Sequence, residues 1–230
     1  HVPKTQKWEF DEEVTNVFDD MLARSIPGYS NMRNLVHKLT LKYAKKDTII
    51  MDLGCSTGEA IRKSVEKLND NFFVGLEVSA PMRRKAQESF KKFNNVEIIN
   101  QDLREGLPSY DKKISVILSV LTIQFTPIEY RLNIIKNIYQ SLSKGGVFIF
   151  VEKVLGETAE IDNTFVELYY DLKGENGYTQ EKIQKKRKSL EGVLVPVTSS
   201  WNIELLKKAG FEDIDCFWRD LNFAGYIAVK

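Results

Sequence analysis

Short apolar runs alternate with amphipathic stretches through the middle of the chain, from about residue 48 to residue 151. The apolar runs have the length of short buried strands, and the stretches between them repeat apolar residues at helical spacing. We predict strands at Thr48–Asp52, Asn71–Glu77, Val96–Asn100, Ile114–Ser119 and Val147–Val151. We predict helices at Glu59–Leu68, from Pro81 to about Phe90, and from Pro127 to a cap at Lys144–Gly146. This alternation indicates a parallel sheet with helices on both faces.

The last thirty residues depart from the alternation. A helix is predicted at Ile203–Ala209, and Gly210 closes it. Two strands follow, Phe211–Arg219 and Asn222–Val229, and the connection between them is too short for anything but an antiparallel pair. The predicted fold is therefore α/β, a doubly wound, mostly parallel, seven-stranded sheet with a C-terminal antiparallel hairpin. That arrangement is typical of the Rossmann-like class I methyltransferases.

Two helical segments flank this core. Residues 8–45 contain apolar residues at helical spacing, interrupted at Ile26–Ser30, where proline and glycine break the helix. Residues 153–197 are helical and highly charged. This second segment is too long for a simple crossover, and we expect it to cover the site as a lid. Since the chain has no repeat, low-complexity tract or linker, we predict one domain over residues 1–230.

Composition narrows the function classes. The 33 basic and 32 acidic residues give a net charge of +1, which lacks the excess of a nucleic-acid-binding protein. Cys55 and Cys216 lie far apart and match no metal-binding spacing, so they favour a reducing compartment. We find no apolar run of membrane-spanning length and no secretory signal. We expect a cytoplasmic protein that binds neither nucleic acid directly nor a membrane.

The candidate chemistry lies in the turn Asp52-Leu-Gly-Cys-Ser-Thr-Gly58 and at the strand ends that follow it. Its glycines allow a tight turn, and the helix after it offers free N–H groups to a nucleoside ligand. Glu77 follows the next strand, where a carboxylate can accept hydrogen bonds from both ribose hydroxyls. Asp102 and Ser119 follow at the ends of later strands. A single such residue often only caps a helix, but a series of four predicts one binding crevice.

Two other enzyme classes could use this turn. Gly54–Gly58 fits the G-x-S-x-G nucleophile elbow of hydrolases, which needs a histidine later in the chain. The only histidines, His1 and His37, both precede Ser56, so we reject that interpretation. A dinucleotide oxidoreductase needs G-x-G-x-x-G, and Ser56 occupies the second glycine position. That alternative stays open.

Several segments together resemble the carboxy-S-adenosyl-L-methionine synthase family. The resemblance runs from about Trp8 to the C-terminus and is carried by Trp8–Asp11, Arg24–Asn31, Asp52–Gly58, Thr122–Phe125, Glu152–Lys153, Asn176–Tyr178 and Lys186–Arg187. A generic methyltransferase would match the glycine turn but not the segment around Tyr29. The resemblance implies conversion of S-adenosylmethionine and prephenate to carboxy-S-adenosylmethionine and phenylpyruvate, the former feeding the oxyacetyl modification of wobble uridine in tRNA.

The resemblance also implies a homodimer, no metal, and a set of ligand contacts. These contacts fall on Tyr29, Gly54, Cys55, Ser56, Glu77, Val78, Asp102, Leu103, Ser119 and Arg187. Two of them depart from the family's usual residues. Glu77 stands where aspartate is common, which lengthens the ribose contact by one methylene. Ser119 replaces an asparagine and loses an amide donor.

Arg187 is the implied catalytic residue. Carboxylation places a new anion on the former methyl group, and a guanidinium pairs with a carboxylate through two parallel hydrogen bonds. The alternative is a solvated basic helix face over residues 182–188, just as Tyr29 could simply pack in its turn. Carbon dioxide would be captured by a carbanion formed from the sulfonium methyl, and prephenate itself could supply the base. Two alternatives remain open: an ordinary methyltransferase acting on a small molecule or tRNA, and a non-catalytic adenosyl-binding partner of a tRNA-modifying enzyme.

Overall fold

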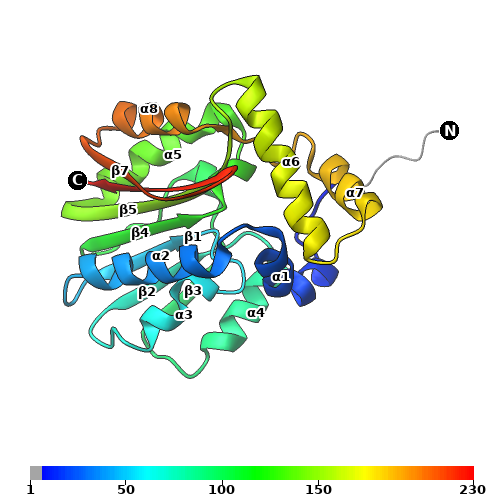
Figure 1. Ribbon diagram of the computed structural model, residues 1–230. Coiled ribbons are helices and arrows are strands. Elements are labelled where there is room, and N and C mark those ends of the chain that lie inside the picture. The colour runs from blue at the N-terminus through cyan, green and yellow to red at the C-terminus, as the bar shows by residue number, and fades with distance from the viewer. Residues whose placement is uncertain (1–6) are drawn as a thin grey trace.

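The computed structural model describes residues 7–230, and a single mixed sheet runs through it (Figure 1). The strand order is β3-β2-β1-β4-β5-β8-β7. The parallel strands are β1 (Ile49–Leu53), β2 (Phe72–Leu76), β3 (Val96–Ile99), β4 (Ile114–Val120) and β5 (Leu142–Leu155). The hairpin strands β7 (Asp213–Asp220) and β8 (Phe223–Val229) are antiparallel, with β8 beside β5. The predicted sheet and its C-terminal hairpin are confirmed.

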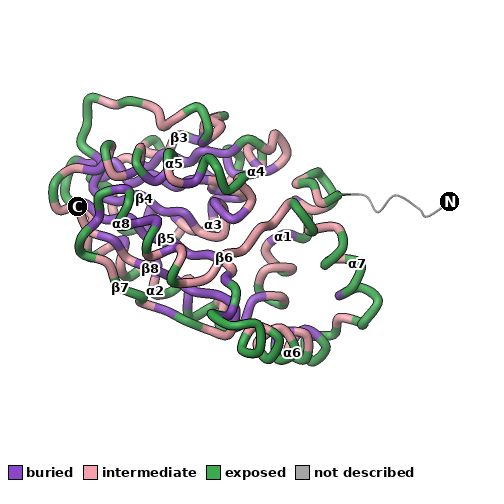
Figure 2. Tube along the Cα trace, turned by 90° about the horizontal axis from the view of Figure 1, so that it is seen from above, coloured by how far each residue is buried: buried purple, intermediate pink, exposed green. Residues whose placement is uncertain are grey.

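Helices cover both faces of this sheet, as the alternation predicted. One hydrophobic cluster lies under α5 (Ile128–Ser141) and α8 (Ser199–Ala209), where Ile135 and Leu206 are fully buried. The second lies under α2 (Tyr29–Tyr43), α3 (Glu59–Val65) and α4 (Ala80–Phe90), where Met32 and Ile61 are fully buried. Figure 2 shows the buried strands between more exposed helices. The two cores fix the strands, and thereby the loops that leave their carboxyl ends.

The clearest differences from the predicted boundaries lie at the two ends of β5. Helix α5 ends at Ser141 rather than at a Lys144–Gly146 cap, because Leu142 is already extended and pairs with Ile114 of β4. Gly145 adopts a left-handed φ of +71° inside the start of β5 instead of capping a helix. Strand β5 also continues to Leu155, and its end pairs with a two-residue strand, β6 (Val197–Thr198). A strand this short has too few residues for a recognisable pattern.

The N-terminal helical segment consists of α1 (Glu12–Ser25) and α2, joined by the predicted break. Asp11 caps α1 by accepting a hydrogen bond from the N–H of Val14. Gly28 precedes α2 with a φ of +59°, and a Cβ there would stand 2.5 Å from Oδ2 of Asp220. The turn therefore requires glycine for both its conformation and its contact with β7.

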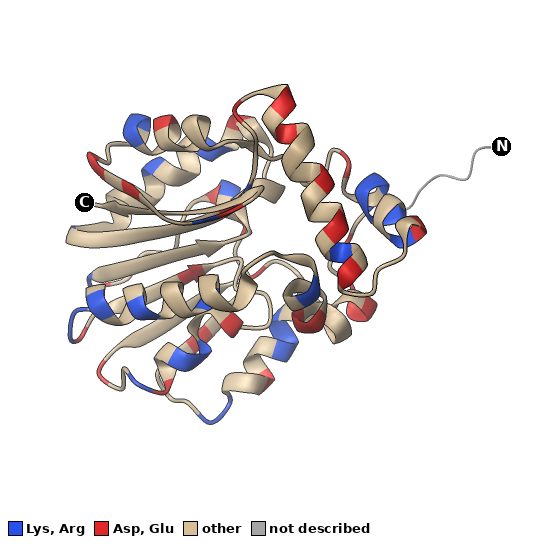
Figure 3. Ribbon diagram, viewed as in Figure 1, with Lys and Arg blue, Asp and Glu red and all other residues tan. Residues whose placement is uncertain are grey.

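The charged segment forms two helices, α6 (Ala159–Glu175) and α7 (Gln180–Leu190), beyond the carboxyl edge of the sheet, near α1 (Figure 1). Thr158 and Thr179 cap them. Their charges differ: α6 is mainly acidic and α7 mainly basic (Figure 3). Of the predicted 153–197 range, the first three residues belong to β5 and the last to β6.

The return from α7 to β6 is fastened to the sheet by Gln124 of the 3₁₀-helix η2 (Ile123–Phe125). Its carbonyl oxygen accepts hydrogen bonds from the N–H of Val195 (2.9 Å) and from Nη2 of Arg131 (3.1 Å). Its side-chain Oε1 accepts the N–H of Lys153 on β5 (2.7 Å). All three bonds involve buried groups, so this end of the segment is firmly attached.

Candidate active site at the carboxyl edge of the sheet

A cavity of about 720 Å³ lies where the parallel strands end. It has three walls: the loops after β1 to β4, the helical segment α1–α2, and the pair α6–α7. Nine of the ten predicted ligand contacts line it, namely Tyr29, Gly54, Cys55, Ser56, Glu77, Val78, Asp102, Leu103 and Arg187. The fold therefore gathers residues from six separate elements and loops into one crevice.

The turn after β1 forms the floor of the cavity. Gly54 and Gly58 have left-handed φ values of +63° and +88°. A Cβ on Gly54 would collide with the side chain of Thr122, and one on Gly58 would collide with the ring of Phe90. Both glycines are therefore required by the packing of the protein itself, and their role in close approach of a ligand stays a prediction. Ser56 lies between them with a positive φ of +50°, which is unusual for a residue with a side chain.

Glu77 holds that strained turn in place. Its Oε2 accepts the N–H of Ser56 at 2.9 Å, and its Oε1 accepts the N–H of Ser79 at 2.7 Å. Burial raises the pKa of Glu77 above its ordinary value, and these two N–H donors reduce the rise. Each carboxylate oxygen has a second lone pair, so the group can still accept hydrogen bonds from a ligand.

Asp52 and Arg33 complete this end of the cavity, although the sequence analysis assigned neither a role. Asp52 is 1% exposed and its Oδ2 has no hydrogen-bond partner within the described chain. Burial raises the pKa of Asp52 to about 7, against the opposing charge of Arg33. The Arg33 guanidinium lies 5.7 Å from the centroid of the Tyr29 ring. The spacing of Tyr29 and Arg33, one helical turn apart, could have indicated that Arg33 shares the cavity-facing side.

The loop after β3 places Asp102 and Leu103 at the neighbouring edge. Asp102 caps the 3₁₀-helix η1 (Leu103–Glu105), and its carboxylate accepts hydrogen bonds from the Arg104 guanidinium at 2.6 and 3.0 Å. These bonds hold the pKa of Asp102 below its ordinary value. Val78, which is 59% exposed, lines the same part of the cavity. An apolar surface beside a carboxylate suits a purine base.

Ser119 is the one predicted contact that does not line the cavity. It is fully buried in β4, and its hydroxyl has no hydrogen-bond partner within the described chain. The next two residues, Val120 and Leu121, line the cavity instead. Because successive residues of a strand point to opposite faces, an offset of one residue moves the side chain away from the crevice.

The wall formed by α6 and α7 carries Arg187 and two lysines, and a third lysine lies nearby at the end of β5; none of the three was a predicted ligand contact. Lys153, Lys173 and Lys186 line the cavity with Arg187. Burial lowers the pKa of Lys173 to about 8 and that of Lys186 to about 7. The available sequence signal was Lys173, the one basic residue in the otherwise acidic helix α6.

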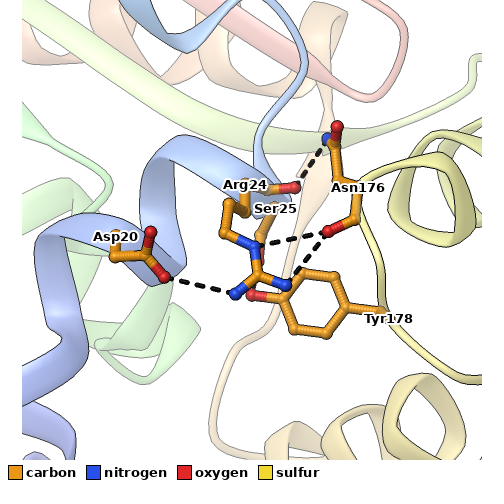
Figure 4. A network of polar contacts seen from close by, with 5 residues as sticks. All are labelled: Asp20, Arg24, Ser25, Asn176 and Tyr178. Atoms are coloured by element: carbon orange, nitrogen blue, oxygen red, sulfur yellow. Dashed lines mark hydrogen bonds and ion pairs between the residues drawn. The ribbon is translucent and has the colours of Figure 1, made fainter.

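Segments that carried the family resemblance are brought together around α1. The side chain of Arg24 donates to the carbonyl oxygen of Asn176 at 3.0 and 3.3 Å, and Asn176 Nδ2 donates to the carbonyl oxygen of Arg24 at 2.9 Å (Figure 4). The Arg24 guanidinium also lies 4.8 Å from the centroid of the Tyr178 ring. Lys186 lies 2.8 Å from the centroid of the Trp8 ring. These contacts hold α6 and α7 against the N-terminal segment.

The rejected hydrolase interpretation finds no support in this cavity. His37 lies on α2, where its Nδ1 is 2.9 Å from Oγ of Ser64, and it does not line the cavity. His1 lies outside the described residues. Cys55 and Cys216 are both free thiols. Within residues 7–230, His, Cys, Asp and Glu side chains form no group of three that could hold a metal ion, and no helix is long and apolar enough to cross a membrane.

Comparisons with known proteins agree with this geometry. Residues 50–146 match a family model described as a methyltransferase domain. Solved structures with the same fold include phosphoethanolamine N-methyltransferase 2 of Haemonchus contortus in complex with S-adenosyl-L-methionine (TM-score 0.68, 15% identity, 96% of this chain, 57% of that chain). A SAM-dependent methyltransferase of Aquifex aeolicus is similar over 96% of this chain and 98% of its own (TM-score 0.58, 14% identity). The fold is that of a class I methyltransferase.

The relatives found by sequence identify the family more specifically than the solved structures do. The carboxy-S-adenosyl-L-methionine synthase of Nautilia profundicola is 38% identical over 99% of this chain and 97% of its own length. The enzymes of that name from Staphylococcus epidermidis (97% of each chain) and Helicobacter pylori (96% of this chain, 93% of that protein) are also 38% identical. Both the glycine turn and the covering helices fall within these matches. The chain belongs to the carboxy-S-adenosyl-L-methionine synthase family.

Proposed function

We propose that this protein is an enzyme that converts S-adenosylmethionine and prephenate to carboxy-S-adenosylmethionine and phenylpyruvate. The observation that carries the proposal is Arg187 at the wall of a cavity whose opposite wall is a strand edge suited to an adenosyl ligand. A simple methyltransferase has no need for a guanidinium beside the sulfonium, because the two cations repel. The product would feed the oxyacetyl modification of wobble uridine in tRNA, so we expect the protein to work in the cytoplasm without binding nucleic acid itself.

The strand-edge residues would hold S-adenosylmethionine. Glu77 would accept the two ribose hydroxyls on the lone pairs that Ser56 and Ser79 leave free. Val78, Asp102 and Leu103 would border the adenine, while the turn Gly54–Ser56 and Tyr29 would border the methionine part. Ser119 would contribute only through the backbone of β4, since its side chain is buried away from the cavity.

The reaction balances without an outside base. Prephenate loses its ring carboxylate as carbon dioxide, and the electron pair of that bond enters the ring and expels the ring hydroxyl as hydroxide. The hydroxide takes one proton from the sulfonium methyl and becomes water. The resulting carbanion attacks the carbon dioxide, which forms the new carbon–carbon bond. Phenylpyruvate and carboxy-S-adenosylmethionine remain.

Arg187 would act as the catalytic residue by pairing with the carboxylate as it forms on the former methyl carbon. Within residues 153–197, helices α6 and α7 would act as a lid, because bulk water would protonate the carbanion before carbon dioxide could reach it. We also propose that the chain is a single domain, that it forms a homodimer and that it needs no metal ion. Sedimentation of the purified protein tests the dimer, and unchanged turnover in the presence of a chelator tests the last point.

The decisive experiment incubates the purified protein with S-adenosylmethionine and prephenate and follows both products by mass spectrometry. We expect a ligand with the mass of S-adenosylmethionine plus one carboxyl group, formed in equal amount with phenylpyruvate. The carboxyl carbon should carry the label when the ring carboxylate of prephenate is labelled. If the protein binds S-adenosylmethionine and forms no such product, a binding role replaces the proposal. Methyl transfer to an added acceptor would make it an ordinary methyltransferase.

A further inference from the structure

The lysines that line the cavity come from other elements than the acids at the strand edge, which Arg33 and Arg104 accompany there. The acidic residues Asp52, Glu77 and Asp102 lie at the strand edge, where the cationic sulfonium ligand is expected. Lys173 and Lys186 line the cavity from α6 and α7, and Lys153 lines it from the end of β5. Arg187 stands beside them. A pocket with this polarity suits a cationic ligand at one end and an anionic ligand at the other.

The three lysines lack carboxylate partners. None of them takes part in an ion pair with a described residue. The nearest acid on the same wall, Asp162, affects Lys153 by its charge, but its Oδ1 accepts the N–H of Gly156 at 2.7 Å. Lys173 is only 8% exposed. A buried ammonium without a counter-ion costs several kcal/mol, so its retention here needs another reason.

Aromatic rings hold the ammonium groups without neutralising them. Lys153 and Lys173 lie 4.9 and 4.3 Å from the centroid of the Tyr169 ring, so both approach the same side chain. Lys186 lies over Trp8. A cation–π contact is worth roughly 0.5–2 kcal/mol, which is less than the cost of removing an ammonium from water. These contacts fix where the lysines stand and leave their charge available to a ligand.

The distribution of charges on helix α6 also indicates that Lys173 serves the cavity. Four of its five acidic residues, Glu160, Glu167, Asp171 and Glu175, are exposed, and its single basic residue, Lys173, is buried toward the cavity. An amphipathic helix normally places its charges outward and its apolar residues inward. The charge of Lys173 also lowers the pKa of Lys186, as that of Lys153 lowers the pKa of Lys173. The three ammonium groups are therefore close enough to repel one another.

We propose that Lys153, Lys173 and Lys186 form the binding site for the carboxylate that the second substrate retains, which is the pyruvyl carboxylate of prephenate. This assignment rests on the proposed function. The ring carboxylate becomes neutral carbon dioxide, so pairing it with lysines would stabilise the reactant more than the transition state and slow its loss. The lysines therefore hold the other carboxylate and direct the ring carboxylate toward the sulfonium. A small 2-oxo carboxylate is the class of ligand that the site accepts.

The test compares Lys153→Met and Lys173→Met with Lys185→Met, which removes an exposed lysine of α7 outside the cavity. Methionine keeps most of the unbranched side chain and removes the charge, and loss of an uncompensated buried charge should raise the melting temperature of Lys173→Met. Loss of a charge-assisted contact should raise the KM for prephenate roughly tenfold or more. The affinity for S-adenosylmethionine should stay within about twofold of that of the wild type. Lys185→Met should behave as the wild type.

Calorimetric titration with phenylpyruvate gives a readout that needs no turnover, since this product carries only the retained carboxylate. Its dissociation constant should rise roughly tenfold in the two cavity variants and stay unchanged in Lys185→Met. If the wild type forms carboxy-S-adenosylmethionine but the cavity variants keep the wild-type KM for prephenate and the wild-type dissociation constant for phenylpyruvate, the lysine site is overturned. The proposed function then stands. If the wild type forms no product but phenylpyruvate binding still depends on the lysines, the anion site stands and the proposed function fails.

Discussion

The N–H of Ser56 donates to Oε2 of Glu77 over 2.9 Å, which ties the turn after β1 to the end of β2. Ser56 has a left-handed φ of +50°, so the turn needs this support even before a ligand binds. Glu77 accordingly has two roles that sequence alone did not separate. It maintains the shape of the glycine turn, and it would bind the ribose.

Glu77→Ala should weaken both the binding of the ribose and the support of the glycine turn. Loss of two ribose hydrogen bonds should reduce the affinity for S-adenosylmethionine by roughly 2–4 kcal/mol, measured by calorimetric titration. Because the N–H groups of Ser56 and Ser79 lose their acceptor, the free energy of unfolding should fall by roughly 1–3 kcal/mol. Glu77→Asp, which keeps a carboxylate on a shorter side chain, is the control and should retain most of the affinity. An alanine variant with unchanged affinity would remove Glu77 from the binding site.

Arg187→Ala should distinguish two ligands that differ by one carboxylate. The affinity for carboxy-S-adenosylmethionine should fall by roughly 2–5 kcal/mol, and that for S-adenosylmethionine should change little. Arg187→Lys should recover only part of the loss, because a point charge lacks the planar fork of the guanidinium. Titrations of the three proteins with both ligands provide the measurement. Equal losses for both ligands would mean that Arg187 supports the lid without touching the new carboxylate.

Asp52 should make stability fall with rising pH. Its pKa is raised to about 7 in the folded protein, so between about pH 4 and 7 the folded state binds more protons than the unfolded state. Unfolding free energy is therefore lost as pH rises through this window. Asp52→Asn should be as stable as the wild type near pH 4 and more stable by roughly 4 kcal/mol above pH 7. Denaturant titration without ligand measures this.

The control for that experiment is Asp70→Asn, whose side chain is 65% exposed. Its stability difference from the wild type should stay small across the same pH range. If Asp52→Asn gave a difference that did not vary with pH, Asp52 would ionise normally in the folded protein and the account of its burial would be wrong.

Arg24→Ala should loosen the lid with little effect on global stability. The contacts of Arg24 with Asn176 and Tyr178 are largely exposed, so the free energy of unfolding should change by less than about 1 kcal/mol. Amide hydrogen exchange in residues 176–190 should nevertheless accelerate by roughly tenfold. Arg84→Ala removes a comparable exposed pair with Glu12, away from the lid, and should leave that exchange unchanged. Equal exchange in both variants would show that the anchor lies elsewhere.

The sequence predicted the core better than the covering segment, for a physical reason. Strand β1 is buried along its whole length, so its apolar run is unmistakable. Glu152 ends the comparable apolar run of β5 after Val151, so the pattern stops there although the strand continues to Leu155. The glycine turn of the site could also be predicted from local sequence, because Gly54 and Gly58 indicate a tight turn with left-handed backbone conformations.

The cluster of Lys153, Lys173 and Lys186 could not be predicted in this way. Lys173 and Lys186 have the same sequence pattern as solvated lysines, and only the packing of α6 and α7 against α1 makes them buried. Ser119 illustrates a different limit. Its strand was predicted, but β4 ends one residue later, at Val120, and a difference of one residue reverses the face to which a side chain points.

The attachment at Gln124 gives the covering helices one fixed end and one releasable end. Lys153 belongs to the fixed part, since its N–H is bonded to Gln124, whereas Lys173 and Lys186 travel with the helices that Arg24 fastens only at the surface. A carboxylate bound by all three lysines would connect the sheet, which carries Lys153, with the covering helices, which carry Lys173 and Lys186. We therefore expect ordered binding, in which S-adenosylmethionine binds first and the binding of prephenate closes helices α6 and α7 over the cavity. Exchange of the methyl protons with solvent would then be held back until the carbon dioxide donor is in place.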